Sequence, residues 1–135
     1  MSYELRETTP EPERFVALRE AADMSSRSVD AARRGLANTL YGVSVVDTDA
    51  DETVGMARIV GDGACVFHIS DMVVHPAHQG QGLGSRIMDA LMAYLEEHAP
   101  ESAYVNLMAD VDGFYEQWGF ERTAPASKGM YLPDW

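Results

Sequence analysis

A glycine-rich loop between a strand-like and a helix-like segment is the stretch of this chain best suited to chemistry. It reads Gln79-Gly80-Gln81-Gly82-Leu83-Gly84 and follows an apolar run that ends at Val74. Such a loop directs several backbone N–H groups to one point, and the start of a helix adds partial positive charge there. The pattern therefore predicts a phosphate-binding site over residues 79–85.

Two common phosphate-binding patterns do not fit this loop. A P-loop ends in Gly-Lys-Ser/Thr, whereas here Gly84 is followed by Ser85 and Arg86. A dinucleotide fingerprint needs a small third residue where Ser85 or Ile87 stands, and it follows the first strand of a parallel sheet. A turn without a ligand is the other alternative, and the flanking strand and helix make it the weaker one.

Two motifs together resemble the GNAT superfamily of N-acetyltransferases. Gln79-x-x-Gly82-x-Gly84 fits the family signature Gln/Arg-x-x-Gly-x-Gly/Ala, and residues 114–120, Phe-Tyr-Glu-Gln-Trp-Gly-Phe, look like its second hallmark, FYxxxGF. The resemblance covers nearly the whole chain and implies acetyl-CoA as cosubstrate, without a metal. It places the pantetheine arm on the backbone of Met72, Val73 and Val74, and the pyrophosphate on Gln79, Gly80, Gln81, Gly82, Leu83, Gly84 and Ser85, assisted by Arg86.

The resemblance also assigns the proton transfers that accompany attack of an amine on a thioester. Tyr115 stands at the position of the general acid, and a tyrosine pKa near ~10 keeps the proton available at neutral pH. His68 stands four residues before the strand triplet, where several members carry the general base. We expect His68, Ser70 and Met72 to share one strand face and Asp71 to alternate away. The alternatives are a core tyrosine and an ordinary strand histidine.

The chain is expected to form one domain over residues 1–135, with elements in the order β-α-α-β-β-β-α-β-α-β-β. Strands are predicted at 2–8, 41–46, 53–60, 64–74 and 104–108, then from Phe120 and around 130–132. Helices are predicted at 12–22, from Ser25 or Ser26 to Leu40, at 83–99 and from Asp110 to Trp118. This order predicts an α/β fold of the α+β type with a mixed sheet. The resemblance specifies a mostly antiparallel sheet of six to seven strands, flanked by about four helices and splayed where acetyl-CoA binds.

Composition limits the partners and the location. The net charge of −12 disfavours nucleic acid and anionic membranes, and no apolar run or signal-like N-terminus is present, so a cytoplasmic protein is expected. The single cysteine, Cys65, is expected to be a small buried side chain. His75 and His78 lack the partners of a metal site. A homodimer is the default assembly.

The acceptor is the least constrained part of the prediction. The leading hypothesis is a primary amine of a small molecule; the alternatives are a protein or peptide amine, or a non-catalytic acyl-CoA-binding module. The acceptor pocket is expected between the first two helices and the C-terminal strands. Glu20, Asp23 and Asp30 lie in the first of these regions, where they would either attract a cation or be solvated.

Overall fold

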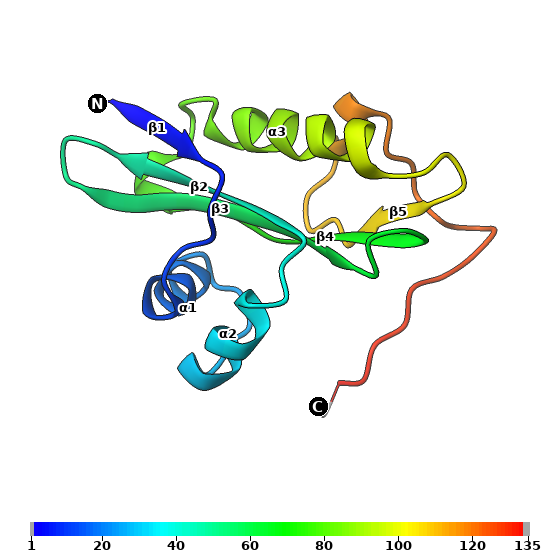
Figure 1. Cartoon of the computed structure of the whole chain (residues 1–135), viewed down its shortest axis with the longest axis horizontal. Helices are drawn as coiled ribbons and strands as arrows, with labels where there is room; N and C mark the ends of the chain where they lie inside the picture. Colours follow the sequence, from blue (N-terminus) through cyan, green and yellow to red (C-terminus); the bar gives the residue numbers. More distant parts are fainter. Residues whose placement is uncertain (1, 134–135) are drawn as a thin grey trace.

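A mixed β-sheet forms the body of the molecule in the computed structural model, which describes residues 2–133 (Figure 1). The first three pairings are antiparallel and the last is parallel. The strands lie side by side in the order β1 (Tyr3–Arg6), β2 (Tyr41–Asp47), β3 (Glu52–Gly61), β4 (Val66–Val74) and β5 (Tyr104–Leu107).

Helices cover both faces of this sheet. Helix α3 (Leu83–His98) links β4 to β5 across one face, whereas α1 (Pro12–Ala21) and α2 (Val29–Leu36) lie on the other (Figure 1). Pro12 opens α1 as predicted, but the cap of α2 is Ser28, whose Oγ accepts the N–H of Ala31 at 3.0 Å. Among the described residues, no helix combines the length and apolarity of a membrane crossing.

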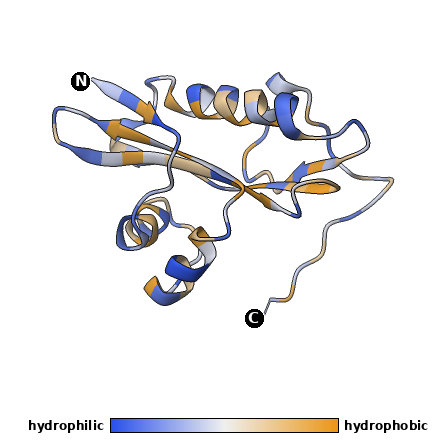
Figure 2. Ribbon diagram, in the orientation of Figure 1, coloured by the Kyte–Doolittle hydropathy of each residue, from blue (hydrophilic) through white to orange (hydrophobic). Residues whose placement is uncertain are grey.

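The apolar core has two parts, one on each face of the sheet. On the α3 face, Ile87, Met88 and Leu91 are fully buried against β2, β3 and β4. On the opposite face, Phe15 and Leu18 of α1 form a smaller cluster with β3 and β4. Figure 2 shows the same division, with apolar residues along the central strands and on the side of α3 that faces them.

The fold class is confirmed, but the predicted numbers of elements are too high. The described residues hold five strands and three α-helices, not six to seven strands and about four helices. The predicted helix from Asp110 is reduced to a 3₁₀ turn, η2 (Tyr115–Trp118), because Gly113 takes φ +82° and interrupts a right-handed helix. No strand forms from Phe120 or at 130–132: within the described residues the sheet ends at β5, and residues 119–133 form turns and irregular structure.

The prediction for Cys65 is wrong: its side chain is exposed. Strand β4 starts at Val66 and not at Ala64, because residues 62–65 form a turn around Asp62. One carboxylate oxygen of Asp62 accepts the N–H groups of Ala64, Cys65 and Val66 at 2.9, 2.7 and 3.0 Å. These bonds lower the pKa of Asp62, and they turn Cys65 out of the sheet.

Candidate active site

The glycine loop connects β4 to α3, as the sequence predicts. A single 3₁₀ turn, η1 (Pro76–His78), follows the strand, and α3 begins at Leu83 with Gly82 as its N-cap. Gly80 and Gly82 have φ of +81° and +77°, a region that side chains with a Cβ rarely adopt. No side chain caps the helix, so the N–H groups of its first turn are available to an anion.

A cavity of about 460 Å³ lies over this helix start and brings the two sequence motifs together. The predicted cofactor residues that line it are Met72, Val74, Gln79, Gly80, Gly82, Leu83, Gly84 and Ser85. From the second motif and the segment before it come Asp110, Val111, Phe114 and Tyr115. Val73, Gln81 and Arg86 do not line it, and Val73 is buried in the core cluster on the α1 and α2 face.

Strand β4 is open along one edge beside this cavity. Its pairing with β5 covers Val66 to Ile69 and ends where Ile69 faces Leu107. Beyond that pair, residues 70–74 bond to β3 alone among the described strands. This splayed edge has the form that the predicted pantetheine contact requires, and the contact itself stays a prediction.

A β-bulge at Asp71 changes which side chains share a face of β4. Its φ is +59°, and the register with β3 shifts between Met56 and Arg58. Met72 consequently packs with the α3 core, whereas Val73 faces α1 and α2. The expectation that His68, Ser70 and Met72 share one face is therefore wrong, because one extra residue reverses the alternation.

The side chain of Asp71 points into a buried ion-pair network, in which both of its carboxylate oxygens have a partner. Its two carboxylate oxygens accept from Arg19 at 2.6 Å and from Arg58 at 2.7 Å. Arg19 also donates to the carbonyl of Ser25, and Arg58 donates to the carbonyl of Gly35 at the end of α2. Burial lowers the pKa of Arg19, and Asp71 opposes that effect. The network joins α1 and α2 to the bulge.

Tyr115 lies in the η2 turn, at the wall of the cavity over the start of α3. Its ring packs edge-on against Phe114, with centroids 5.1 Å apart, and against Phe120 at 6.4 Å. Burial raises the pKa of the Tyr115 phenol, and the nearby charge of Asp110 raises it further. The phenol therefore keeps its proton at neutral pH, which is the state that a general acid needs.

The His68 ring is oriented by Asn106, a residue that the sequence analysis did not identify. It lies opposite Asn106 of β5, and its Nδ1 is 2.7 Å from the Asn106 Oδ1. An amide oxygen can only accept, so Nδ1 carries the proton and Nε2 keeps the lone pair that a base requires. Asn106 is the polar residue within the short apolar strand Tyr-Val-Asn-Leu. A polar residue at that position was the feature of the sequence that could have indicated its role.

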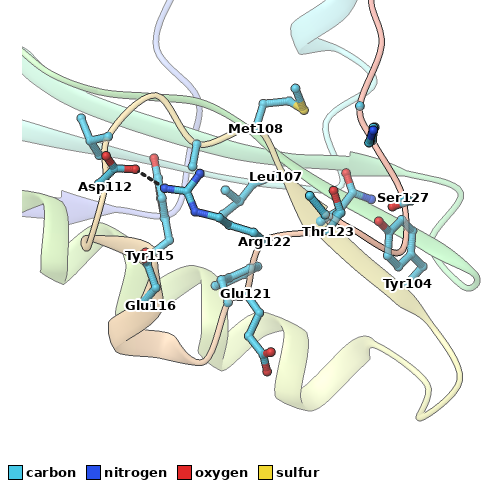
Figure 3. Close-up of a pocket in the computed structure, with 17 residues that line it drawn as sticks. Tyr104, Leu107, Met108, Asp112, Tyr115, Glu116, Glu121, Arg122, Thr123 and Ser127 are labelled. Atoms are coloured by element: carbon cyan, nitrogen blue, oxygen red, sulfur yellow. Dashed lines mark hydrogen bonds and ion pairs between the residues drawn. The ribbon is translucent and has the colours of Figure 1, made fainter.

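A second, larger cavity of about 590 Å³ adjoins Tyr115. It is bounded by β5, the segment 108–112, η2 and residues 120–129, and it includes Asn106. Figure 3 places the Asp112–Arg122 ion pair near Tyr115 at one end, and Tyr104 and Ser127 at the other. Neither cavity is lined by Glu20, Asp23 or Asp30, nor by any other residue of α1 or α2.

The histidines of the loop are engaged within the protein. Nδ1 of His75 accepts the N–H of Ala77 at 3.1 Å, and Nδ1 of His78 is 2.9 Å from the hydroxyl of Tyr3. Within residues 2–133, no three His, Cys, Asp or Glu side chains are grouped as a metal ion would require.

Comparison with known proteins agrees with this geometry. The family model described as "Acetyltransferase (GNAT) domain" matches residues 13–131. GCN5-related N-acetyltransferase 2 of Arabidopsis thaliana is 32% identical over 108 residues, which are 69% of this chain and 41% of that protein. Serotonin N-acetyltransferase 2 of Oryza sativa is 35% identical over 83 residues, 62% of this chain and 42% of that one. The chain thus spans about two fifths of the length of these two relatives.

Solved structures share the fold over nearly the whole chain. A probable acetyltransferase from methicillin-resistant Staphylococcus aureus is 41% identical, with a TM-score of 0.91 over 97% of this chain and 98% of that one. A GNAT acetyltransferase of Brucella melitensis, determined with acetyl-CoA, has a TM-score of 0.63 at 17% identity, over 90% of this chain and 84% of that one. On these matches and the geometry above, this chain belongs to the GNAT family of acetyltransferases, enzymes that use acetyl-CoA.

Proposed function

We propose that this protein transfers the acetyl group of acetyl-CoA directly to a primary amine of a small molecule. The carrying observation is that Tyr115 and Val111 line both cavities. A donor thioester in the smaller cavity and an amine in the larger one would therefore meet beside the phenol of Tyr115. Such positioning of two reactants supplies a large part of the rate enhancement in group transfer.

The proposed roles of the side chains follow from their positions. The pyrophosphate binds to the open N–H groups at the start of α3, near Gly80 and Gly82, which lets an acidic protein hold an anionic cofactor. Nε2 of His68 accepts a proton from the amine through water. Tyr115 returns a proton to the departing thiolate.

The sheet separates the two catalytic side chains. Tyr115 packs with the α3 core, whereas His68 belongs to the opposite face, because its neighbours Phe67 and Ile69 both lie in the α3 core. His68 lines neither of the two cavities, so in this proposal a proton from the amine reaches its Nε2 through water at the splay beyond Ile69.

Charge near the larger cavity favours an amine acceptor. Asp112, Glu116 and Glu121 line it together with Arg122 and Lys128, and Asp112 is already paired with Arg122. The remaining carboxylates give the cavity a mild preference for a cation, consistent with the overall charge of −12. A peptide amine is the alternative acceptor, and the assay below includes one.

The test combines calorimetric titration with acetyl-CoA and thiol release over a panel of small amines and a peptide with a free N-terminus. We expect acetyl-CoA to bind and at least one small amine to be acetylated. Tyr115→Phe should lower kcat by at least ~10²-fold and leave acetyl-CoA binding intact. Tyr94→Phe is the matched control, since Tyr94 of α3 lines neither of these two cavities. Unchanged turnover in Tyr115→Phe would remove Tyr115 from the mechanism, and acetylation of the peptide alone would replace the small-molecule acceptor.

A further inference from the structure

The cavity over the start of α3 contains a histidine that the sequence analysis did not assign to the cofactor. Among the described residues that line this cavity, His78 is the one basic side chain and Asp110 the one acidic side chain. Arg86, which the resemblance assigned to the pyrophosphate, does not line the cavity and is exposed on α3. His78 is therefore the side chain in this cavity that can give an anionic cofactor a charge-assisted contact.

His78 lies directly before the predicted phosphate loop. It is the last residue of η1, and its N–H donates to the carbonyl of His75 at 2.8 Å. Gly80, with its φ of +81°, follows two residues later and leads to the open N–H groups at the start of α3. The half-buried ring of His78 and these N–H groups thus belong to one short segment and to one cavity.

Two aromatic neighbours hold the ring of His78. Tyr3 of β1 meets it edge-on with ring centroids 5.8 Å apart, and His75 does so at 5.9 Å. The hydroxyl of Tyr3 lies 2.9 Å from Nδ1 of His78. A hydroxyl can donate or accept, so it satisfies Nδ1 whether or not that nitrogen is protonated. Within residues 2–133, the other ring nitrogen, Nε2, has no hydrogen-bond partner.

We infer that Nε2 of His78 donates a hydrogen bond to the pyrophosphate of acetyl-CoA, and that Tyr3 positions the ring for this contact. The contact adds a side-chain donor to the backbone N–H groups of the helix start. Tyr3 does not line the cavity, so it acts through His78. Strand β1, where Tyr3 pairs with Asp47 of β2, thereby becomes a support of the cofactor site.

The position of His78 favours the pyrophosphate over the second phosphate group of coenzyme A, which is attached to the ribose. Because His78 stands two residues before Gly80, one ligand group can accept from both the ring and the loop. Dephospho-CoA lacks the ribose phosphate and keeps the pyrophosphate, so it distinguishes the two contacts. The inference rests on the proposed placement of the pyrophosphate and not on the identity of the acceptor.

The test is calorimetric titration of the full chain with CoA and with dephospho-CoA. His78→Phe keeps a ring between Tyr3 and His75 but removes both nitrogens. It should raise the two dissociation constants by the same factor, at least about tenfold. His78→Gln should lose less affinity, because its amide nitrogen can replace Nε2 as a donor. His98→Phe makes the matched change at an exposed site at the other end of α3, outside both cavities, and should bind like the wild type.

A double-mutant cycle tests the role of Tyr3. Tyr3→Phe removes the hydroxyl and should raise the dissociation constant of CoA about threefold in the wild type, but not further in His78→Phe. A merely structural role of Tyr3 would give the same loss in both backgrounds and would overturn the positioning role. In the wild type, long-range ¹H–¹⁵N NMR should show a proton on Nε2 of His78 when CoA is bound. An unprotonated Nε2 in that complex would overturn the inference without any variant.

The outcomes separate this contact from the proposed activity. Equal affinities of the wild type and His78→Phe for both ligands would overturn the inference and leave the activity standing. A loss confined to CoA would also overturn it, because His78 would then contact the ribose phosphate. Tight binding that depends on His78, in a protein that acetylates no amine, would refute the proposed activity and support this contact.

Discussion

A Cβ added to Gly84 would lie 3.2 Å from Cζ of Phe114, so the glycine motif and the aromatic motif are in direct contact. The same added atom would lie 3.7 Å from Cε of Met72 on β4. Gly84 therefore lets Phe114 pack against the first turn of α3, and this packing holds η2 and Tyr115 beside the cavity over the start of that helix. Two motifs that are 30 residues apart act as one structural unit.

Gly84→Ala should displace Phe114 and weaken acetyl-CoA binding. The added methyl group would lie 3.2 Å from Cζ of Phe114, so the ring must move by a few tenths of an ångström; overpacking of this kind typically costs about 1–3 kcal/mol. We expect the dissociation constant for acetyl-CoA, measured by calorimetry, to rise several-fold. Adding Phe114→Leu should restore part of the affinity, because a smaller side chain relieves the overlap.

Gly35→Ala is the control for this substitution. Gly35 is also helical, but the nearest atom to its added Cβ is Nη2 of Arg58 at 3.8 Å, an ordinary contact. This variant should bind acetyl-CoA normally and gain up to about 1 kcal/mol of helix stability. Equal losses of affinity in Gly35→Ala and Gly84→Ala would show that the Phe114 contact is not the cause.

The raised pKa of Tyr115 predicts the alkaline side of the pH profile. A general acid works only while it is protonated, and burial moves the loss of its proton above the ordinary tyrosine value near ~10. The profile of kcat should therefore show no decline from Tyr115 ionisation up to that pH, after correction for thioester hydrolysis. An alkaline decline near pH 8 that disappears in Tyr115→Phe would contradict the direction of the shift.

Asn106→Ala should impair His68 without touching the cofactor. The Asn106 Oδ1 fixes the proton on Nδ1 of His68, and its removal frees the ring to rotate and to change tautomer. We expect kcat to fall about tenfold, with the KM for acetyl-CoA unchanged. Long-range ¹H–¹⁵N NMR of the imidazole should report the Nδ1–H tautomer in the wild type and a mixture in the variant. A wild-type ring protonated on Nε2 would contradict the proposed role of the base.

The parts of the fold that follow local rules were predictable from the sequence. Pro12 and the glycine loop mark helix starts by backbone conformation, and the stripe of Leu83, Ile87 and Leu91 identifies the buried face of α3. The two motifs line one cavity in the structure, and the assignment of that cavity to the cofactor stays a prediction based on the phosphate-binding geometry of loops and helix starts.

The features that depend on tertiary partners were not predictable. The bulge at Asp71 places its carboxylate between Arg19 and Arg58, which are 52 and 13 residues away in sequence, and it reverses the faces of Met72 and Val73. The absence of strands at 120–133 was not predictable either, because pairing with a strand edge depends on tertiary placement and not on the local apolar pattern. The pairing of His68 with Asn106 depends on the register of two parallel strands, which no local pattern specifies.

Removing the charge of Asp71 should be among the most destabilising substitutions that preserve side-chain shape in this chain. Asp71→Asn keeps the side-chain shape and tolerates the positive φ, but it leaves Arg19 and Arg58 without their carboxylate. Breaking a buried ion pair by removing one partner typically costs about 3–5 kcal/mol. Chemical denaturation should show this loss, together with a lower kcat, because the network anchors the bulge at the splay.

Asp23→Asn separates the charge effect from the backbone effect. Asp23 also has a positive φ, of +57°, but it is exposed, so only the backbone requirement is shared with Asp71. Its free energy of unfolding should change by less than about 0.5 kcal/mol. If Asp71→Asn were equally mild, the two arginines would have to be stabilised by other acceptors, such as the carbonyls of Ser25 and Gly35 that they already contact. The anchoring of the bulge would then rest on its backbone, and kcat should stay at the wild-type value.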